Sequence, residues 1–376
     1  MIFIPVNYLR EGMVLAQDVS IEVGGNPLLT RGQVLKDSYI RKLIALNIMG
    51  VYIESQISAD IHVTGIIDNK LKKEALTTVK HVFEDFYSTN KLNLSEVLSI
   101  RDIAERLVMD ILSHNEILIN LIDLKGYDDY TYKHSLCVAI IAITVGVKLG
   151  LDEKHLNMLA MGGLLHDVGK MVISKEILNK PGRLSTEEYE AMKKHPVAAV
   201  RMLQNNPYIP ESVLKAIESH HEKYDGTGYP SQLKGERIPY LGRILAVADV
   251  YDALTSERPY RKPCFPNEAI EYMMGNAFVH FDYDVLEAFL RSVAAYPAGM
   301  LVVLSSGQMA LVVKNNPENT LRPIVRLVDS EASGEDDIDL LHDLQYHNVT
   351  IIGTGYQKDT MNYNTLQKNE DPLFEL

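Results

Sequence analysis

Short apolar runs separated by glycine-containing turns characterise the first 55 or so residues of the chain. Three such runs lie at residues 14–16, 28–29 and 51–53, and turn signals lie at Gly12, Gly24, Gly25 and Gly32. Between the last two runs, residues 39–45 show the apolar spacing of a helix. Residues 1–60 are therefore predicted to form a small α+β module, and this module contains no catalytic motif.

Helical spacing replaces this pattern after about residue 66. In the first helical run the apolar side chains recur three or four residues apart, at Leu71, Ala75, Val79, Val82 and Phe86. A second helical run covers residues 103–122. Residues 61–110 are predicted to be a helical connector, whose apolar faces would suit packing in a bundle or a homodimer interface.

The helical pattern continues from residue 111 to residue 297, with loops marked by proline and glycine. After Pro297 the period changes to that of a small β meander, with strands expected at residues 301–304, 310–313, 324–328 and 349–352. The predicted fold is multidomain and mainly α. A helical domain at 111–297 is followed by a C-terminal β extension at 298–355 and a polar, loosely ordered tail at 356–376.

Composition narrows the class of protein. With 46% hydrophobic and 23% charged residues, the 376-residue chain has the composition of a soluble globular protein. It contains no run of about 18 apolar residues, so we expect no membrane span. Residues 1–5 lack the basic start and the cleavage site of a signal peptide. The two cysteines, Cys137 and Cys264, are too few for a disulfide framework. We therefore expect the protein to be located in a reducing cytoplasm.

The net charge of −13 argues against a nucleic-acid polymer as partner, because such a partner needs a basic face. A small anionic ligand remains compatible with this charge, because local cations and metal ions can supply the positive field that it needs.

Seven side chains of metal-binding type lie in the predicted helical domain: His134, His166, Asp167, His195, His220, His221 and Asp249. Taken singly, each has another interpretation, because a lone histidine in a helix is most often a hydrogen-bonded core or surface residue. The pair His220 and His221 would equally suit an exposed helix C-terminus. Taken together, all seven lie on a predicted helix or at its end.

The predicted helices place these side chains as follows. His134 begins the apolar helix at 135–149, and Asp249 lies within the helix at 241–254. The pair His166 and Asp167 (the HD pair) ends the helix at 156–165. The pair His220 and His221 (the double histidine) ends the helix that begins near Glu211. A capping box at 185–188 begins a short helix, at whose end we expect His195.

Helices pack into bundles whose inward-facing histidines and carboxylates build dinuclear metal sites. Imidazole and carboxylate ligands without thiolate suit iron, manganese or zinc. Seven ligands are too many for one tetrahedral ion. They suit two ions about 3.5–4 Å apart that share a bridging carboxylate, for which Asp167 is the natural choice.

Longer motifs surround these residues. Residues 166–170 read HDVGK, and residues 220–230 read HHEKYDGTGYP. Four shorter segments accompany them: YTYKHS at 130–135, KHP at 194–196, DVYDALT at 249–255 and RPYR at 258–261. The HD dipeptide alone would be weak support, but the ordered set is specific. It resembles the HDxGK and HHExxDGxGYP signatures of the HD-GYP group of HD phosphohydrolases.

This resemblance implies an HD-type all-helical catalytic bundle that hydrolyses the bacterial second messenger cyclic di-GMP to pGpG and then to GMP. It implies that the seven side chains bind two divalent metal ions, iron or alternatively manganese, with Asp167 and Lys170 as catalytic residues. It also implies that Lys170 faces the phosphate, that Gly228 and Tyr229 shape the substrate pocket, and that Arg258 and Arg261 contact phosphate oxygens. Solvated surface side chains are the alternative for Lys170 and both arginines.

Other functions fit parts of the pattern. The substrate could be another cyclic dinucleotide, such as cyclic GMP-AMP. A second alternative is a catalytically weak sensor of cyclic di-GMP, which the intact ligand set and Lys170 disfavour. A third is a nucleotide phosphohydrolase of the broader HD superfamily, which the Gly228-Tyr229-Pro230 segment disfavours. The N-terminal module lacks the acidic pocket and the lysine of a phosphoacceptor receiver.

Tyr130 yields a prediction about metal stoichiometry. Members of the resembled family with a third metal carry a glutamate four residues before the first histidine, where this chain has Tyr130; Asp128 and Asp129 are out of step. Because Tyr130 lies one helical turn before His134, it would face the same cavity, although packing at the helix start is the alternative. We expect two metals per chain in the native protein, and Tyr130→Glu should raise the number toward three by metal analysis. Three fully occupied metals in the unmodified protein would contradict this and would point to Asp128 or Asp129.

Overall fold

The computed structural model describes residues 1–20, 26–46, 48–61, 63, 65–89, 92–114, 118–120, 130–180, 182–256, 263–328 and 337–356, without the side chains of residues 88, 89, 130 and 131. The described chain divides into two compact units. The helical unit contains residues 66–119 and 130–292. The β unit contains residues 1–65, Asn120 and residues 293–356.

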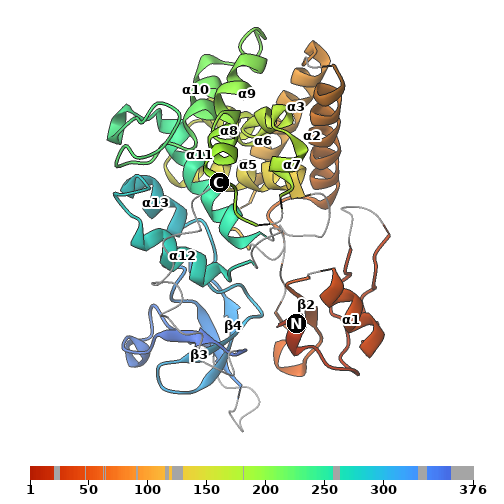
Figure 1. Cartoon of the computed structure of the whole chain (residues 1–376). Coiled ribbons are helices and arrows are strands. Elements are labelled where there is room, and N and C mark those ends of the chain that lie inside the picture. Colours follow the sequence, from red (N-terminus) through yellow and green to blue (C-terminus); the bar gives the residue numbers. More distant parts are fainter. Residues whose placement is uncertain are drawn as a thin grey trace. The chain divides into compact units, whose positions relative to one another are not determined.

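The helical unit follows the predicted order (Figure 1). Its α-helices are α2 (Asn69–Thr89), α3 (Leu94–Leu112), α5 (Tyr130–Lys148), α6 (Glu153–Leu165), α7 (Lys175–Leu178), α8 (Thr186–Met192), α9 (His195–Leu203), α10 (Glu211–Ser219), α11 (Tyr240–Thr255), α12 (Pro266–Gly275) and α13 (Tyr283–Leu290). Two short 3₁₀ turns, η3 (Val168–Val172) and η4 (Gly235–Arg237), lie in the connections. The helices predicted at 135–149, 156–165 and 241–254, and the one predicted to begin near Glu211, are confirmed.

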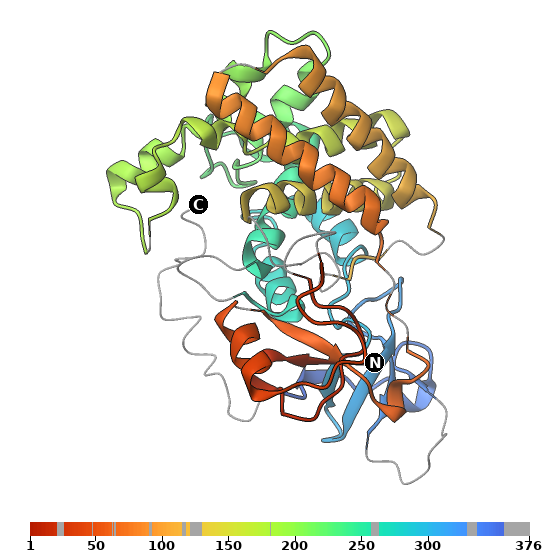
Figure 2. The same ribbon diagram turned by 90° about the vertical axis from the view of Figure 1, so that its right-hand side faces the viewer.

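Helices α5 and α11 form the centre of this unit. Residues 133–146 of α5 are buried without interruption, and most of α11 is buried as well. A helix that is apolar on all sides has to be covered on all sides. Accordingly α5 packs against α2, α6 and α11, and α10 packs against α6, α9 and α11. Helices α2 and α3 lie side by side and cover the bundle next to α5 and α6 (Figure 2).

One prediction within this unit is wrong. His195 was expected at the end of the helix that the capping box at Ser185 begins, but that helix, α8, ends at Met192. His195 is instead the first residue of α9, and Pro196 occupies the next position, where its fixed φ suits a helix start.

The β unit is built from both ends of the chain. Strand β1 (Ile2–Pro5) pairs antiparallel with β2 (Gly50–Ile53), beside α1 (Asp37–Ala45) and the 3₁₀ turns η1 (Val6–Tyr8) and η2 (Gln56–Ser58). The sequence pattern missed β1. The apolar runs at 14–16 and 28–29 form isolated bridges rather than strands, such as those from Val14 to Val34 and from Val19 to Leu29.

A five-stranded antiparallel sheet completes this unit, in the order β6-β5-β4-β3-β7. The strands are β3 (Leu301–Leu304), β4 (Met309–Lys314), β5 (Ile324–Leu327), β6 (Ile338–Asp339) and β7 (Ile351–Thr354), with the 3₁₀ turn η5 (Leu344–Tyr346) between the last two. The predicted meander is thus confirmed, and β6 is an addition to it. The predicted fold class, a mainly helical protein with small flanking β elements, is confirmed.

Contacts between the two ends of the chain hold the β unit together. Ile2, Ile61 and Leu311 belong to one buried apolar cluster. The Arg326 guanidinium forms hydrogen bonds of 2.8 Å with both carboxylate oxygens of Asp60 and also pairs with Asp337 at 2.7 Å. The N-terminal residues and the C-terminal sheet therefore share one apolar cluster.

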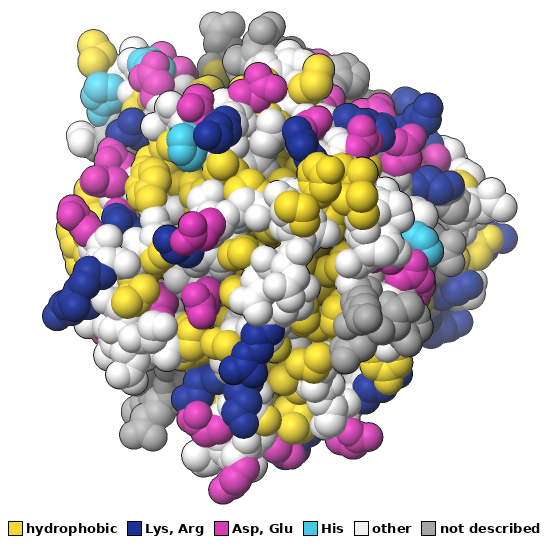
Figure 3. All heavy atoms as spheres, turned by 90° about the horizontal axis from the view of Figure 1, so that it is seen from above, with side chains coloured by type: hydrophobic (Ala, Val, Ile, Leu, Met, Phe, Trp, Pro, Cys, Tyr) yellow, Lys and Arg dark blue, Asp and Glu magenta, His cyan; other side chains and the backbone are white. Residues whose placement is uncertain are grey.

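The surface carries charges of both signs. On the face shown in Figure 3, acidic and basic side chains are interspersed among hydrophobic ones. None of the described helices combines the length and the apolar character that crossing a bilayer requires.

The contact between α5 and α6 yields a stability prediction. A Cβ atom added at Gly163 would lie 2.5 Å from the Cα and 2.7 Å from the backbone nitrogen of Ala139, and backbone atoms in a buried helix cannot move aside cheaply. Gly163→Ala should therefore lower the free energy of unfolding by about 1–3 kcal/mol, the usual cost of overpacking. Chemical denaturation followed by circular dichroism measures this.

Gly275→Ala is the matched control, because a Cβ atom at this helical glycine meets nothing within 4 Å. This control should be neutral or slightly stabilising, since alanine favours the helix. Equal stability of the two variants would contradict the close approach of α5 and α6.

Candidate metal centre

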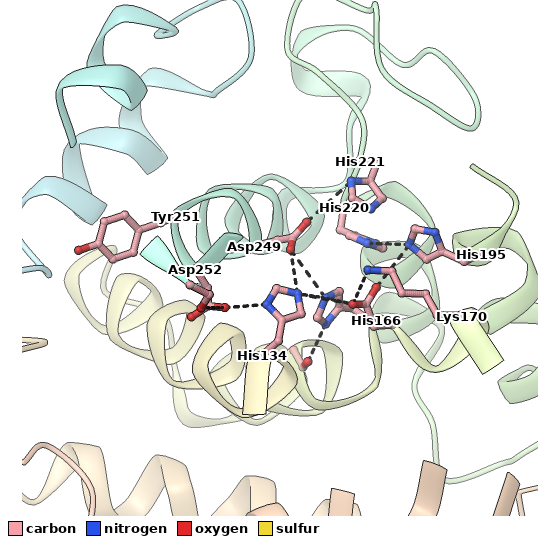
Figure 4. A network of polar contacts seen from close by, with 12 residues as sticks. His134, His166, Lys170, His195, His220, His221, Asp249, Tyr251 and Asp252 are labelled. Carbon is pink, nitrogen blue, oxygen red and sulfur yellow. Dashed lines mark hydrogen bonds and ion pairs between the residues drawn. The ribbon is translucent and has the colours of Figure 1, made fainter. Parts of the chain in front are cut away.

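Five helices bring seven side chains to one place (Figure 4). The start of α5 supplies His134, and the end of α6 supplies His166 and Asp167. The start of α9 supplies His195, the end of α10 supplies His220 and His221, and the middle of α11 supplies Asp249. Six of these residues are buried and His221 is nearly so. The structure therefore brings together all seven side chains that the sequence singled out.

The seven side chains form two groups that share two carboxylates. In each of two sets, one ligand atom per residue lies within 4.8 Å of the others: His134 with His166 and Asp167, and His195 with His220 and His221. In the first group, the Nε2 atoms of His134 and His166 lie 3.2 Å apart. In the second, the Nε2 atoms of His195 and His220 lie 3.4 Å apart. Such short distances between ring nitrogens are typical of imidazoles that converge on a common ion.

Both carboxylates lie between the two groups. One Asp167 oxygen lies 3.5 Å from His134 Nε2, and its other oxygen lies 3.5 Å from His195 Nε2. Asp249 repeats this arrangement, with one oxygen 3.1 Å from His134 Nε2 and the other 3.8 Å from His221 Nδ1. The sequence suggested a bridging position for Asp167 alone, whereas the geometry gives Asp249 an equivalent one.

A repeated local hydrogen bond orients three of the imidazoles. The Nδ1 atom of each ring donates to the carbonyl oxygen three residues earlier: His166 to Gly163 at 2.8 Å, His195 to Met192 at 2.9 Å and His220 to Ile217 at 2.6 Å. Because a carbonyl can only accept, this bond fixes the proton on Nδ1 and leaves the Nε2 lone pair directed at the centre.

The carbonyl acceptors come from helix ends. His166 and His220 are the C-cap residues of α6 and α10, and Met192 is the last residue of α8. The last turn of a helix leaves carbonyl groups without an intrahelical donor, so a histidine just past the end can bond to one of them. The ends of these helices therefore decide where the imidazoles point.

Burial and neighbouring charges set the protonation of the centre. Burial lowers the pKa of His195 to about 3 and that of His220 to about 4. Burial alone would raise the pKa of Asp167, but His166 and Lys170 hold it well below its usual range. Neutral imidazoles and ionised carboxylates are the forms that bind metal ions.

His134 differs from the other histidines. Burial lowers its pKa, but hydrogen bonds with Asp249 and Asp252 outweigh this effect and raise the pKa to about 9. Asp249 itself has a pKa well below its usual range, because its hydrogen bond with His134 outweighs its burial. A metal ion bound through His134 Nε2 would therefore have to displace a proton from this ring.

The donor set fits a pair of divalent cations. Asp167 Oδ1 and His221 Nε2 are buried and have no hydrogen-bond partner among the described residues. Buried polar atoms without a partner are costly, and a cation would satisfy both of these. Ring nitrogens and carboxylate oxygens without thiolate are the ligands of iron, manganese and zinc. The two groups thus have the chemistry of a binuclear metal site.

Lys170 and Tyr229 border the centre. The Lys170 ammonium lies 2.8 Å from Asp167 Oδ2 and is partly exposed, whereas the sequence interpretation directed it at a phosphate. The Tyr229 ring stacks on His221 with ring centroids 4.7 Å apart. Gly228 allows the chain to pass close beside Glu222 and Lys223, which follow the double histidine, because a Cβ atom there would lie 2.2 Å from the backbone nitrogen of Lys223.

Three predicted positions cannot be placed. Arg258 and Arg261 lie outside the described residues, and so does the side chain of Tyr130. Helix α5 begins at Tyr130, so the backbone of this residue lies on the same helix as His134, about one turn before it.

A known family model matches the part of the chain that carries this centre. A family model described as an HD domain matches residues 107–285, a range that contains all seven side chains. Over these residues the chain is therefore similar to HD-domain proteins. The resemblance that the sequence motifs carried is thereby confirmed.

Three curated relatives are similar to this chain. A cyclic di-GMP phosphodiesterase of Pseudomonas aeruginosa is 39% identical over 232 residues, which are 62% of this chain and 56% of the relative. A cyclic di-GMP phosphodiesterase response regulator of Xanthomonas campestris pv. campestris is 41% identical over 153 residues, 40% of each protein. A 3'3'-cGAMP-specific phosphodiesterase of Vibrio cholerae is 32% identical over 226 residues, 60% of this chain and 40% of the relative. This chain thus spans 40 to 56% of the length of these relatives.

The sequence interpretation missed two carboxylates of the HD domain. Asp252 accepts a hydrogen bond from His134 Nδ1 at 2.7 Å. Glu222 is buried and accepts hydrogen bonds from the backbone N–H groups of Ser231 at 2.7 Å and Leu233 at 3.0 Å. Asp252 lies inside the motif DVYDALT, and Glu222 lies inside HHEKYDGTGYP. Their positions in these motifs were the sequence signal that could have identified them. Through these two hydrogen bonds, Glu222 holds residues 231–233, at the C-terminal end of the loop that places Tyr229 against His221.

This loop yields a prediction. Glu222→Ala should raise the amide exchange rates of Ser231 and Leu233 at least tenfold, because hydrogen bonds to a charged acceptor contribute about 1.5–3 kcal/mol. Hydrogen exchange measured by mass spectrometry or NMR tests this. Glu236→Ala, at an exposed glutamate of the same connection, is the control and should leave both rates unchanged. Unchanged exchange in the Glu222 variant would contradict the role of this carboxylate in the loop.

Proposed function

We propose that the chain is a metal-dependent phosphodiesterase that hydrolyses cyclic di-GMP, first to linear pGpG and then to GMP. The observation that carries the proposal is the convergence of five imidazoles and two shared carboxylates on one buried centre. Dinuclear centres of this composition are suited to phosphoester hydrolysis. The relatives named as cyclic di-GMP phosphodiesterases support the choice of substrate.

The seven side chains are the proposed metal ligands. His134, His166 and Asp167 would hold one ion, and His195, His220 and His221 the other, with Asp167 and Asp249 available to both. Iron is the proposed metal, and manganese is the alternative. When bound, the pair of ions supplies the Lewis-acid chemistry of the reaction, which comprises activation of water and neutralisation of phosphoryl charge.

The remaining residues would bind and orient the substrate. The Lys170 ammonium lies at the Asp167 carboxylate, so it can donate to a phosphate oxygen that approaches this edge of the centre. The ring of Tyr229, stacked on His221, provides an aromatic wall beside the second group. Arg258 and Arg261 follow α11 in the sequence and would contact phosphate oxygens through bidentate hydrogen bonds.

Cyclic GMP-AMP is the alternative substrate, and the relative named as specific for 3'3'-cGAMP is the observation that favours it. The two substrates share the ring of ribose and phosphate and differ in one base. Turnover of both by the same preparation decides between them.

The test of the proposal is metal analysis of anaerobically purified protein, with chromatography of the products formed from cyclic di-GMP and cyclic GMP-AMP. We expect two metals per chain and conversion of cyclic di-GMP to pGpG. Protein that is loaded with metal and cleaves neither substrate would overturn the proposal.

Asp167→Ala should abolish hydrolysis and lose at least one metal ion, because this carboxylate lies at the histidines of both groups. Metal content by elemental analysis and turnover by chromatography measure the two effects. Asp284→Ala, at an exposed carboxylate of α13, is the control and should retain both. Normal turnover with full metal content in the Asp167 variant would refute the assignment.

Alanine at Arg258 or Arg261 should lower kcat/KM by one or more orders of magnitude, as expected from the loss of a charge-assisted contact of about 1.5–3 kcal/mol. Metal content should not change. Arg291→Ala is the control, because this exposed arginine of the helical unit pairs only with Glu287 among the described residues. If kinetics are unaltered in both variants, Arg258 and Arg261 are solvated surface residues.

A further inference from the structure

His134 is held by carboxylates at both of its ring nitrogens, and both carboxylates belong to α11. Asp249 Oδ1 lies 3.1 Å from Nε2, and Asp252 Oδ2 lies 2.7 Å from Nδ1. The two aspartates are three residues apart in the helix, so their side chains point to the same neighbour, α5 (Figure 4). Asp249 faces the metal centre, whereas Asp252 lies behind the ring.

The other described imidazoles of the centre have no such support. His166, His195 and His220 each donate Nδ1–H to a neutral backbone carbonyl. The Nδ1 atom of His221 lies 3.8 Å from Asp249, too far for a hydrogen bond. The first group therefore contains one histidine backed by a full negative charge, and the second group contains none.

Asp252 is itself fixed in place. Its side chain is fully buried, and Oδ2 also accepts a hydrogen bond from the Ser256 hydroxyl at 3.0 Å. A carboxylate behind a metal-binding histidine fixes the tautomer and ring orientation and increases the electron donation of the opposite nitrogen. A buried, immobilised carboxylate is well placed to do so.

We infer that Asp252 is a positioning residue that strengthens metal binding at the group containing His134 and leaves the group containing His195, His220 and His221 largely unaffected. The two metal positions are then chemically unequal, because a charge-backed imidazole belongs to only one of them. The inference rests on the proposed function in one respect, namely that the seven side chains bind metal.

The experiment is a titration of the full-length, metal-depleted protein with Mn²⁺, with free Mn²⁺ followed by electron paramagnetic resonance. Asp252→Asn keeps the shape and the acceptor oxygen but removes the charge. We expect this variant to bind two ions, with one binding step weakened 10- to 100-fold and the other changed less than threefold. The weakened step should be the one that His134→Ala loses.

Two further variants separate this role from a general effect on folding. Asp282→Asn is the matched control, because Asp282 is also a buried carboxylate of the helical unit but pairs with Arg243 at 2.7 Å instead of a histidine. It should leave both binding steps unchanged. Ser256→Ala keeps the charge of Asp252 and removes its second hydrogen bond, so it should weaken the same step by less than Asp252→Asn does.

The possible failures are distinguishable. If the unmodified protein binds no Mn²⁺, the proposed function fails at its metal centre and this inference fails with it. If the unmodified protein binds two ions and Asp252→Asn binds both with unchanged affinity, or loses both steps equally while its helix content is native, only the positioning role is overturned.

Discussion

A hydrogen bond from Nδ1 to a helix-terminal carbonyl is the interaction on which the centre depends. Without it, a buried imidazole could turn over and present the wrong nitrogen, and the helix end would keep an unsatisfied acceptor. The same hydrogen bond, to the carbonyl three residues earlier, orients the ring and satisfies the acceptor at His166, His195 and His220. The lengths of α6, α8 and α10 are therefore part of the site, because each helix has to end where its carbonyl meets the ring.

The second constraint is the burial of charge. Two aspartates whose pKa values lie well below the usual range are enclosed among apolar helices. Ionised groups tolerate such surroundings only when they are paired, and here Lys170 pairs with Asp167 while His134 pairs with Asp249. A substrate phosphate that reaches Lys170 would compete with Asp167 for the same ammonium, so substrate binding and the charge balance of the centre are coupled.

Much of the site could be predicted because its residues mark helix ends and helix interiors in local sequence. The HD pair follows an apolar helix, the double histidine follows another, and Asp249 lies within an apolar stretch; each was placed correctly. The position of His195 was wrong because Pro196 starts a new helix there, and the capping box upstream gave no sign of how long its own helix would be. The hydrogen bond between His134 and Asp252 joins residues 118 positions apart, and no local pattern encodes a contact of that kind.

The β unit was the hardest part to predict, because one of its apolar clusters is assembled from both ends of the chain. Ile2 and Ile61 pack with Leu311, and the Phe3 N–H donates to the Gly299 carbonyl at 2.8 Å. In covalent order, the helical unit is thus an insertion within the β unit. During synthesis Ile2 and Ile61 are made before Leu311, so the apolar cluster that these three residues share stays incomplete until the helical unit and the first strands of the C-terminal sheet have been translated.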